Sequence, residues 1–527
     1  MKKYILFLLA GLSFVGVHAQ NNFIACGEQS GIWNYDTVFV QCDVMIPDAA
    51  TLEIAAGTKV IFEGYYSIHV QGRLRAIGTE ADSILFTVTD TTGFGDIHSQ
   101  AGGWNGIRFE ETPLENDSSG FEYCRFSFGK AVGDSVNCYG GAFRLNRFSK
   151  LAISHSGLTH NYAFFRGGGL YASKSHIVLK DCYIADNRAG NDSLIYGYGG
   201  GIFFVSSNPD VQRNTFVRNT SNGVGGGAAF EYSNPVLLNC VFDDNYSALG
   251  GGLGFLRCSP DRSIANLLII NNESTFFGGG VACLTASPRM TNLTITGNSS
   301  AMGGGYYCND YADSQLYNSI IYGNYAYDSI GSQVWIWDVY SEPEFYHCDI
   351  QYGTDSFGGS TFHGVYENCI ESDPVFSDVA DRNFRLKMES PCINSGTPDT
   401  AGLMLPAFDF DFHARIIYDQ IDMGAFEYDG PVGQSELIVQ ESLFTIFPNP
   451  IAENSVIMVN PYNSEPITFA LFDILGKRIP ISENDFNGKL IIPIMSLNIN
   501  KIPSGIYLLK AFCEDRYSVI RMIISEN

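Results

Sequence analysis

The chain has 527 residues, of which 45% are hydrophobic and 17% charged, and its formal net charge is −25. That much apolar sequence is sufficient for a large buried core. The acidic balance excludes nucleic acid and anionic membrane surfaces as expected partners, because both require clustered Lys and Arg.

Residues 1–19 have the features of a secretory signal peptide. Lys2 and Lys3 precede an apolar run from Ile5 to Val17, and Ala19 ends a small-residue cleavage site. No later segment of about twenty apolar residues follows, so we expect no transmembrane helix. The alternative is a retained N-terminal anchor, for which the run is short. The sequence therefore predicts export, to the medium or to the outer cell surface.

A glycine pair or triplet followed by apolar residues recurs through the middle of the chain. The intervals between successive copies are 27, 32, 26, 25, 28 and 25 residues. A period in this range is typical of a solenoid, in which each repeat stacks on its neighbours. The copies begin at Gly140, Gly167, Gly199, Gly225, Gly250, Gly278 and Gly303.

Each repeat contains a strand and a fixed corner. With the first glycine as position zero, positions +3 and +5 are apolar in every repeat while +4 varies, as in Phe143 and Leu145. This alternation predicts a strand with one buried face. Upstream, an apolar residue precedes asparagine by three positions, as in Ile184 and Asn187. Asparagine tolerates left-handed backbone, and stacked asparagines can form a hydrogen-bonded ladder. The expected fold is all-β, a parallel β-helix.

The repeats resemble the right-handed parallel β-helix of the pectin-lyase-like superfamily and the GGA/GGG plus FxxN repeats of chlamydial polymorphic outer-membrane proteins. The opening strands at 51–79 and 102–109 resemble first coils of that superfamily, and DPVF, SPCINSG, DFDFHAR and DMGAFEY within 371–428 resemble a closing segment. The resemblance implies a β-helix passenger over residues 20–430.

The tail has a different pattern. After a linker at 431–442, short alternating strands with turn signals predict a small β-sandwich over 443–527. The blocks FTIFPNP, LFDILGK, PSGIYLLK and RYSVIRMIIS resemble the C-terminal sorting domain of type IX secretion cargo from Bacteroidetes. The resemblance implies handling by the type IX secretion machinery. The residues that carry it are Pro448, Asn449, Pro450, Gly476, Gly505, Tyr507 and Arg521.

Thirteen cysteines are present, and their spacing matches no paired CxxC zinc pattern. Cys283 and Cys308 share position +5 on adjacent repeats, within reach of a disulfide. We expect them instead to remain thiols that fill an inward ladder, since a free cysteine behaves as a small hydrophobe. A second thiol ladder is expected from Cys182, Cys240, Cys348 and Cys369.

Catalytic signals are few. The GHG and RIK motifs of galacturonases are absent, and Asp243-Asp244 reads as a polar corner before Asn245. His155, His160 and His176 lack a nucleophile or ligand partner in the pattern. No cofactor is expected. Calcium is the one ion for which the sequence offers candidate ligands, the carboxylate oxygens of Asp409, Asp411 and Asp422. These aspartates are better explained by turns and by an ion pair with Arg415.

Position +4 gives the leading candidate for a binding site, because it faces outward. Two arginines followed by aromatics would suit an anionic sugar, with guanidinium groups for the carboxylate and rings for the pyranose. Loops at 130–139 and 188–198 add Tyr196 and Tyr198. In the alternative, the aromatics pack under these loops and the arginines pair with Glu110 or Asp192. In chain order, position +4 is Arg108, Arg144, Tyr171, Phe203, Ala229, Gly254, Ala282, Tyr307 and Trp335.

The sequence therefore predicts a secreted or surface-displayed binding or adhesion protein, with a carbohydrate such as an acidic polysaccharide, or a host surface, as its partner. A polysaccharide lyase or glycoside hydrolase on the same scaffold is the first alternative. A structural surface protein is the second.

Overall fold

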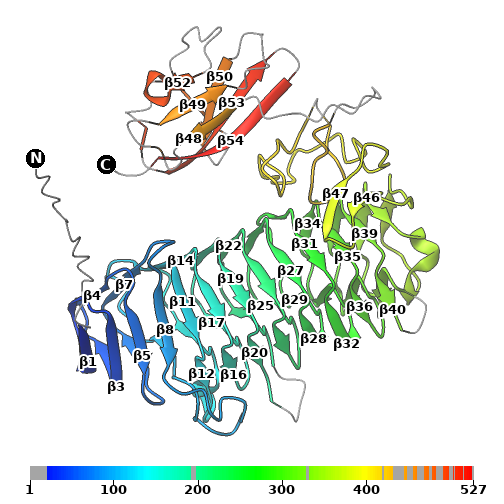
Figure 1. Ribbon diagram of the computed structural model, residues 1–527. Coiled ribbons are helices and arrows are strands. Elements are labelled where there is room, and N and C mark those ends of the chain that lie inside the picture. The colour runs from blue at the N-terminus through cyan, green and yellow to red at the C-terminus, as the bar shows by residue number, and fades with distance from the viewer. Residues whose placement is uncertain are drawn as a thin grey trace, which may run out of the picture. The chain divides into compact units, whose positions relative to one another are not determined.

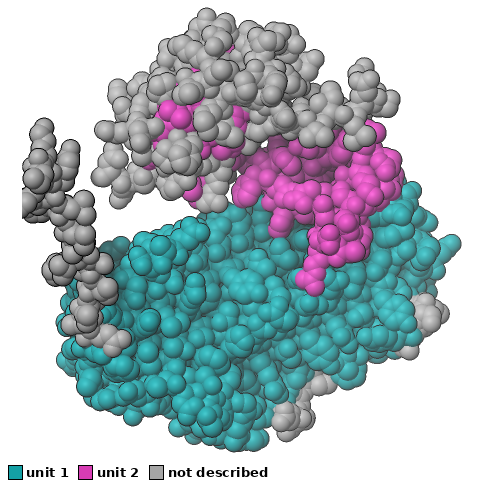
Figure 2. Space-filling view, viewed as in Figure 1, with its two compact units in different colours: residues 1–374, 395–397, 423–425 teal, residues 375–394, 398–422, 426–527 magenta. Residues whose placement is uncertain are grey.

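The computed structural model describes residues 21–191, 197–327, 331–417 and 420–430. In the C-terminal region it describes 444–447, 451, 455–459, 468–473, 477–481, 491–497, 502–503, 505–513 and 516–524. Contacts divide the chain into two compact units (Figure 2): unit 1 contains residues 1–374, 395–397 and 423–425, and unit 2 the remainder. The proposed signal peptide and linker lie outside the described residues. No helix among those described is long and apolar enough to cross a membrane.

Unit 1 is a parallel β-helix, as the repeats predict (Figure 1). Two ladders share its largest sheet. The first contains the strands that follow the glycine triplets, and β1 and β3 also extend along the second ladder. The first-ladder strands are β1 (Asn22–Glu28), β3 (Thr37–Ile46), β6 (Ile68–Val70), β9 (Ile107–Phe109), β13 (Phe143–Asn146), β17 (Leu170–Ser173), β21 (Ile202–Val205), β25 (Ala228–Glu231), β29 (Leu253–Leu256), β33 (Val281–Leu284), β37 (Tyr306–Asn309), β41 (Val334–Ile336) and β44 (Gly358–Gly359).

The second ladder contains, in most coils, the strands that precede the asparagine corner. Its strands are β5 (Lys59–Phe62), β8 (Ile84–Val88), β11 (Cys124–Ser127), β15 (Gly157–Thr159), β19 (Tyr183–Ala185), β23 (Thr215–Val217), β27 (Val241–Asp243), β31 (Leu268–Ile270), β35 (Thr294–Thr296), β39 (Ile320–Tyr322) and β43 (Asp349–Ile350).

A separate sheet of 13 parallel strands forms another face of the coils. Its strands are β2 (Gly31–Trp33), β4 (Thr51–Ile54), β7 (Arg73–Ile77), β10 (Ser119–Glu122), β14 (Leu151–Ser154), β18 (Val178–Lys180), β22 (Asp210–Gln212), β26 (Val236–Leu238), β30 (Ile264–Ala265), β34 (Arg289–Thr291), β38 (Gln315–Tyr317), β42 (Glu344–Tyr346) and β45 (Val365–Glu367).

A third sheet of eight short strands lies between the asparagine corner and the glycines. Two single 3₁₀ turns, η1 (Ser135–Cys138) and η2 (Gly353–Ser356), also belong to unit 1. The eight strands are β12 (Lys130–Ala131), β16 (Tyr162–Ala163), β20 (Arg188–Ala189), β24 (Thr220–Ser221), β28 (Tyr246–Leu249), β32 (Glu273–Phe277), β36 (Ser299–Ser300) and β40 (Tyr325–Ala326).

The core is built from the predicted inward positions. Residues +3 and +5 of every glycine repeat are fully buried. Identical side chains stack from coil to coil, with ring centroids 5.8 Å apart for Phe204 and Phe230 and 4.7 Å apart for Phe216 and Phe242. Because similar side chains occupy the same position in successive coils, they stack directly on one another and fill the interior. Each coil thus serves as the template for the next.

The asparagine ladder is confirmed, and it includes Asn272, which the sequence pattern did not single out. The Nδ2 atom of each asparagine donates to Oδ1 of the next at 2.9–3.0 Å, from Asn161 to Asn324. Gln333 accepts the last of these bonds at 2.8 Å. The expectation that the asparagines themselves adopt left-handed backbone was wrong. The preceding residue does so, for example Asp186 (φ 57°) and Asp244 (φ 56°), because each ladder asparagine must point its amide inward.

The inward placement of the cysteine ladders is also confirmed. Cys182, Cys240, Cys283, Cys308 and Cys348 are buried free thiols, and Cys369 is half-buried. Burial raises the pKa of Cys182, Cys240 and Cys283 to about 12, so these thiols behave as apolar fillers.

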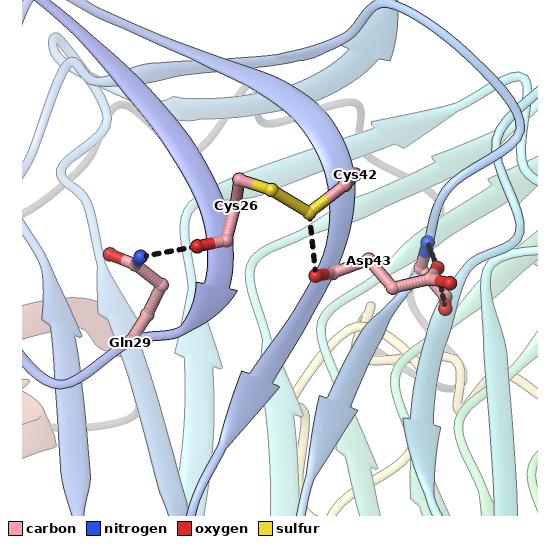
Figure 3. Close-up of a disulfide and its surroundings, with 5 residues drawn as sticks. Cys26, Gln29, Cys42 and Asp43 are labelled. Carbon is pink, nitrogen blue, oxygen red and sulfur yellow. Dashed lines mark hydrogen bonds between the residues drawn. A yellow bond between two sulfur atoms is a disulfide. The ribbon is translucent and has the colours of Figure 1, made fainter.

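One disulfide, which the sequence analysis did not identify, joins Cys26 of β1 to Cys42 of β3 in the first coils (Figure 3). Beside it, the Gln29 side chain donates to the Cys26 carbonyl oxygen at 3.1 Å. The first coil of a solenoid has a neighbour on one side only, so a cross-link there opposes fraying of the end.

Unit 2 contains the antiparallel pair β46 (Phe376–Asp378) and β47 (Asn383–Leu386), and two small antiparallel sheets formed by the C-terminal residues. Phe444, Ile457, Leu471 and Leu509 contribute to their common core, as expected for a sandwich. The C-terminal elements are β48 (Phe444–Phe447), β49 (Val456–Val459), β50 (Thr468–Asp473), β51 (Arg478–Ile479), β52 (Ile491–Pro493), η3 (Ile494–Leu497), β53 (Gly505–Cys513) and β54 (Arg516–Ile524).

Candidate functional site

The candidate stripe has the register that the sequence predicts. Arg108, Arg144, Tyr171 and Phe203 are direct partners on β9, β13, β17 and β21. The row continues through Ala229, Gly254 and Ala282 to Tyr307 and Trp335. At its other end the row begins earlier than predicted, because His69 of β6 pairs with Arg108.

The stripe is largely covered. Arg108 and Phe203 have no exposed surface, Tyr307 is 2% exposed and Arg144 is 4% exposed. Tyr171, Tyr198 and Trp335 are half-buried, and Tyr196 lies outside the described residues. This burial corresponds to the alternative in which loops cover the row, and an open arginine–aromatic groove was the wrong expectation for these side chains.

The two arginines are held by groups of the protein itself. Arg108 donates from Nη1 to the Gly140 carbonyl oxygen at 2.5 Å and from Nη2 to Asn105 Oδ1 at 2.8 Å. Arg144 forms a two-pronged ion pair with Glu110, at 2.6 Å and 2.7 Å. The pairing with Glu110 was one of the anticipated alternatives, and it fixes the guanidinium plane.

Titratable groups surround this arginine pair. Burial, and then the charge of Arg144, lower the pKa of Arg108 to about 9. Burial lowers the pKa of His69 and raises that of Tyr65. The Tyr65 hydroxyl donates to the Val132 carbonyl oxygen at 3.0 Å and ties the strands to the 130–139 loop. We call His69, Arg108, Glu110 and Arg144 the arginine cluster.

The aromatic part of the stripe is a stack of rings. Tyr139 and Tyr171 are stacked at 4.9 Å, and Tyr171 and Phe203 at 6.0 Å. The Arg166 guanidinium lies 5.0 Å from the Tyr198 ring and 5.3 Å from the Phe203 ring. These ring faces contact one another or a cation of the same chain, which leaves mainly ring edges toward solvent.

A different part of the β-helix exposes aromatic side chains. They lie on and beside the eight-stranded sheet, where Figure 1 shows β28, β32, β36 and β40 side by side. Trp337, which follows β41, extends the group onto the neighbouring face. We call the five side chains the aromatic surface; each is between 40% and 58% exposed, and they are Tyr246, Phe276, Tyr325, Tyr327 and Trp337.

Strand β32 connects the members of this surface. The Tyr246 hydroxyl is 2.7 Å from Thr275 Oγ1. The Tyr327 hydroxyl donates to Glu273 Oε1 at 3.2 Å, across the intervening coil. These bonds hold the two tyrosine hydroxyls in place, although both rings stay exposed.

Phe277, at the end of β32, supports the tryptophan. Its ring lies 4.7 Å from Tyr307 in a stacked pair and 5.1 Å from Trp337 in an edge contact. Tyr307, one of the stripe candidates, therefore lies beneath the aromatic surface, where burial raises its pKa.

A β-bulge explains why this coil differs. β28 and β32 are in register at Tyr246 and Glu273, but Leu249 pairs with Phe277, so β32 holds one extra residue. A bulge re-aims side chains, and here Thr275 and Phe276 are exposed. The interval from Asn272 to Gly278 is six residues, one more than in the coils on either side, but Asn161–Gly167 and Asn219–Gly225 also span six, so the sequence alone did not single this coil out.

The remaining catalytic candidates are not brought together. His155 stacks on Tyr123, and its Nδ1 lies 3.6 Å from Glu122 Oε1. His160 has left-handed backbone at the asparagine corner. His176 Nδ1 accepts from the Asn208 backbone N–H at 2.7 Å. Each histidine thus has separate neighbours.

The three candidate calcium ligands are already engaged within unit 2. Asp409 accepts backbone N–H groups on both carboxylate oxygens, and so does Asp422. Asp411 receives the Arg385 guanidinium at 2.8 Å. Within the described parts of the chain, no three His, Cys, Asp or Glu residues form a group that could hold a metal ion.

Arg415 pairs with Glu427 at 2.8 Å, and both side chains are buried. This partner, five residues after Asp422, was not among the candidates that the sequence offered for Arg415. Burial raises the pKa of Glu427 to about 9 and also raises that of Asp422. The Asp409 carboxylate raises the pKa of His413.

These shifts predict that the closing segment loses stability as pH rises. Glu427, Asp422 and His413 all bind a proton more tightly when folded, so the folded form holds more protons than the unfolded one above about pH 4. The stability they contribute is complete below that pH and declines through the range up to about 9. Hydrogen exchange of residues 409–427 at pH 5 and pH 8.5 should show lower protection at pH 8.5.

The matched control is Glu427→Gln, which keeps a hydrogen-bonding side chain but cannot ionise. It should flatten the pH dependence of exchange in this segment. Equal protection of the wild-type segment at both pH values would contradict the assignment.

The sorting-motif residues are only partly described. Pro448, Asn449, Pro450 and Gly476 lie outside the described residues. Gly505 begins β53, where Tyr507 is buried and its hydroxyl donates to the Pro503 carbonyl oxygen at 2.9 Å. Arg521 pairs with Leu508 between β54 and β53. Pro503, Gly505 and Tyr507 thus lie at the start of the β53–β54 hairpin.

Comparisons with known proteins agree with both parts of the chain. The family described as "Right handed beta helix region" matches residues 114–300, and "Secretion system C-terminal sorting domain" matches residues 445–525. No curated protein matches the sequence. A solved chain titled "Crystal structure of pectate lyase Pel9A" covers 71% of this chain and 89% of its own, at 12% identity and a TM-score of 0.34. The chain is an exported protein, secreted or attached to the outer cell surface, that combines a right-handed parallel β-helix with a type IX secretion sorting domain.

Proposed function

We propose that this exported β-helix is a binding protein for a neutral polysaccharide, which contacts the aromatic surface. The observation that carries the proposal is the exposure of Tyr246, Phe276, Tyr325, Tyr327 and Trp337 around one bulged strand. Exposed aromatic groups of this size on an exported protein indicate an interaction site. A rigid scaffold suits such a role, because little ordering is needed when the ligand binds.

The arrangement suits an extended ligand. Tyr246 and Tyr325 occupy equivalent positions three coils apart, which is about 14 Å at the usual strand spacing. The equivalent positions between them are Glu273 and Ser299, of which Ser299 is small. A chain of pyranose rings could place its apolar faces on the aromatic rings and its hydroxyls against Glu273 and Thr275.

Charge favours a neutral ligand over an acidic one. Glu273 is exposed and forms no ion pair with any described residue, and the chain carries a net charge of −25. The arginines of the stripe, by contrast, are engaged within the chain: Arg144 pairs with Glu110, and Arg108 donates to the Gly140 carbonyl oxygen and to Asn105. An anionic polymer would therefore meet repulsion at this surface, which uncharged hydroxyl-rich chains avoid.

The test is a glycan array that carries neutral and acidic polysaccharides, probed with the full chain and with Trp337→Ala. We expect selective binding to neutral glycans and a loss of affinity of about 5- to 30-fold in the variant, because one aromatic contact contributes on the order of 1–2 kcal/mol. Tyr183→Ala is the matched control, since Tyr183 is an exposed tyrosine on β19 outside the aromatic surface. Binding only to acidic glycans, or to none, would refute the proposal.

The second candidate function is cleavage of a polysaccharide at the arginine cluster. The observation in its favour is that His69, Arg108 and Arg144 lie on adjacent coils with Glu110 beside them. A histidine with lowered pKa is a suitable acid–base group near neutral pH. Release of new reducing ends or unsaturated sugars by the wild type, absent in His69→Ala, would favour this function over binding alone.

A further inference from the structure

Two pairs of free cysteines lie directly opposite each other on neighbouring coils. Cys283 of β33 is in register with Cys308 of β37. Cys348 and Cys369 are the second pair, because Tyr346 pairs with Glu367 just before them and Asp349 pairs with Ile370 just after. In-register positions on adjacent strands lie within the Cα separation that a disulfide needs.

Cys348 and Cys369 are in contact. The Cys348 backbone N–H donates to Cys369 Sγ at 3.4 Å. The hydrogen bond with the Cys348 thiol is also the largest factor that lowers the pKa of Cys369. Because the thiolate is the reactive form of cysteine, Cys369 has the greater nucleophilic character of the two.

The two pairs differ in access. Both thiols of Cys283 and Cys308 are fully buried, so no oxidant can reach either sulfur. Cys369 is half-buried and belongs to the last complete coil, next to β45. The far end of the β-helix, like the first coils, has a neighbouring coil on one side only.

We propose that Cys348 and Cys369 form a second disulfide after export, which cross-links the last coils as Cys26–Cys42 cross-links the first. Sequence spacing and burial alone predicted thiols at both positions. Only one thiol of this pair needs to be accessible to the oxidant, because the buried thiol of Cys348 already contacts Cys369.

The reaction is a thiol–disulfide exchange with a low-molecular-weight or protein disulfide as oxidant. The Cys369 thiolate attacks one sulfur of the oxidant, and its partner sulfur leaves as a thiolate. Cys348, on losing its proton to that thiolate, then attacks Cys369 Sγ and displaces the second oxidant sulfur. The chain loses two electrons and two protons, and the oxidant is reduced to two thiols.

The experiment treats the full folded chain with oxidised glutathione, alkylates free thiols and maps peptides without reduction. A chymotryptic digest is needed, because no Lys or Arg lies between residues 348 and 369. We expect a peptide pair joined through Cys348 and Cys369, together with the Cys26–Cys42 pair. Cys283 and Cys308 serve as the matched control and should be alkylated only after denaturation.

A serine variant gives an independent readout. Cys369→Ser should fold, because Ser156 and Ser319 already occupy equivalent places in this ladder. Reduction should lower the thermal midpoint of the wild type more than that of Cys369→Ser, since Cys26–Cys42 contributes equally to both. If Cys348 and Cys369 are both alkylated after oxidation while Cys26–Cys42 stays linked, or if reduction shifts the two midpoints equally, the second disulfide does not form.

Discussion

Replacement of Gly226 by alanine is expected to prevent stable folding of the β-helix. A Cβ at this second glycine of the triplet would overlap the carbonyl oxygen of Gly251 on the next coil and approach that of Tyr246. Both obstacles are backbone atoms, so no rotamer change relieves them. The free energy of unfolding should fall by about 4 kcal/mol or more, the range of severe steric substitutions. Urea unfolding followed by circular dichroism measures it.

The matched control is Gly157→Ala on β15. The nearest atom to a Cβ there, the Tyr183 carbonyl oxygen, is 4.0 Å away, which is ordinary contact. The free energy of unfolding of this variant should lie within about 0.5 kcal/mol of that of the wild type. If the two substitutions lowered the free energy of unfolding by similar amounts, the glycine triplets would not be required for the close approach of neighbouring coils.

The second large effect is expected for Asn245→Leu in the asparagine ladder. Asn245 Oδ1 accepts from both nitrogens of Asn219, and its Nδ2 donates to the Phe216 carbonyl oxygen at 2.9 Å and to Asn272. Leucine has a similar volume but leaves the Asn219 N–H and the Phe216 carbonyl unpaired in a dry interior. The cost should be about 3–5 kcal/mol.

Thr215→Ala provides the comparison, because Thr215 is half-buried on the outward face of β23 of the same region. Its substitution should change the free energy of unfolding by about 0.5 kcal/mol or less. A small effect of Asn245→Leu in the same urea titration would show that the ladder is not a principal source of stability.

The repeat accounts for how much of the fold the sequence predicts. Glycine spacing and the +3/+5 alternation are local in sequence, and parallel stacking repeats them at every coil, so strand register follows directly. The stripe from Arg108 to Trp335 was therefore aligned correctly. The asparagine corner was placed correctly as well, although the left-handed residue is the one before it.

The burial of the stripe could not be predicted in the same way. Whether Arg108 or Phe203 is exposed depends on where irregular loops such as 130–139 fold back, and loops do not follow the repeat. The aromatic surface was missed for a related reason. Phe276 is exposed through a one-residue bulge, and Tyr246, Tyr325 and Tyr327 lie on a sheet whose strands are as short as two residues. A strand of two residues is too short to show the apolar–polar alternation from which strands are predicted.

The most direct test of the proposed function uses the four tryptophans of the chain. Trp33 and Trp104 are buried and Trp335 is half-buried, whereas Trp337 is 51% exposed. Acrylamide quenching of tryptophan emission should therefore report mainly on Trp337. The measurement compares quenching with and without a panel of soluble neutral polysaccharides, for the full chain and for Trp337→Phe. We expect a neutral polysaccharide to protect the wild type from acrylamide and to leave the quenching of Trp337→Phe unchanged. A polysaccharide that binds the chain without protecting Trp337 would contradict the assignment of the aromatic surface as the binding site.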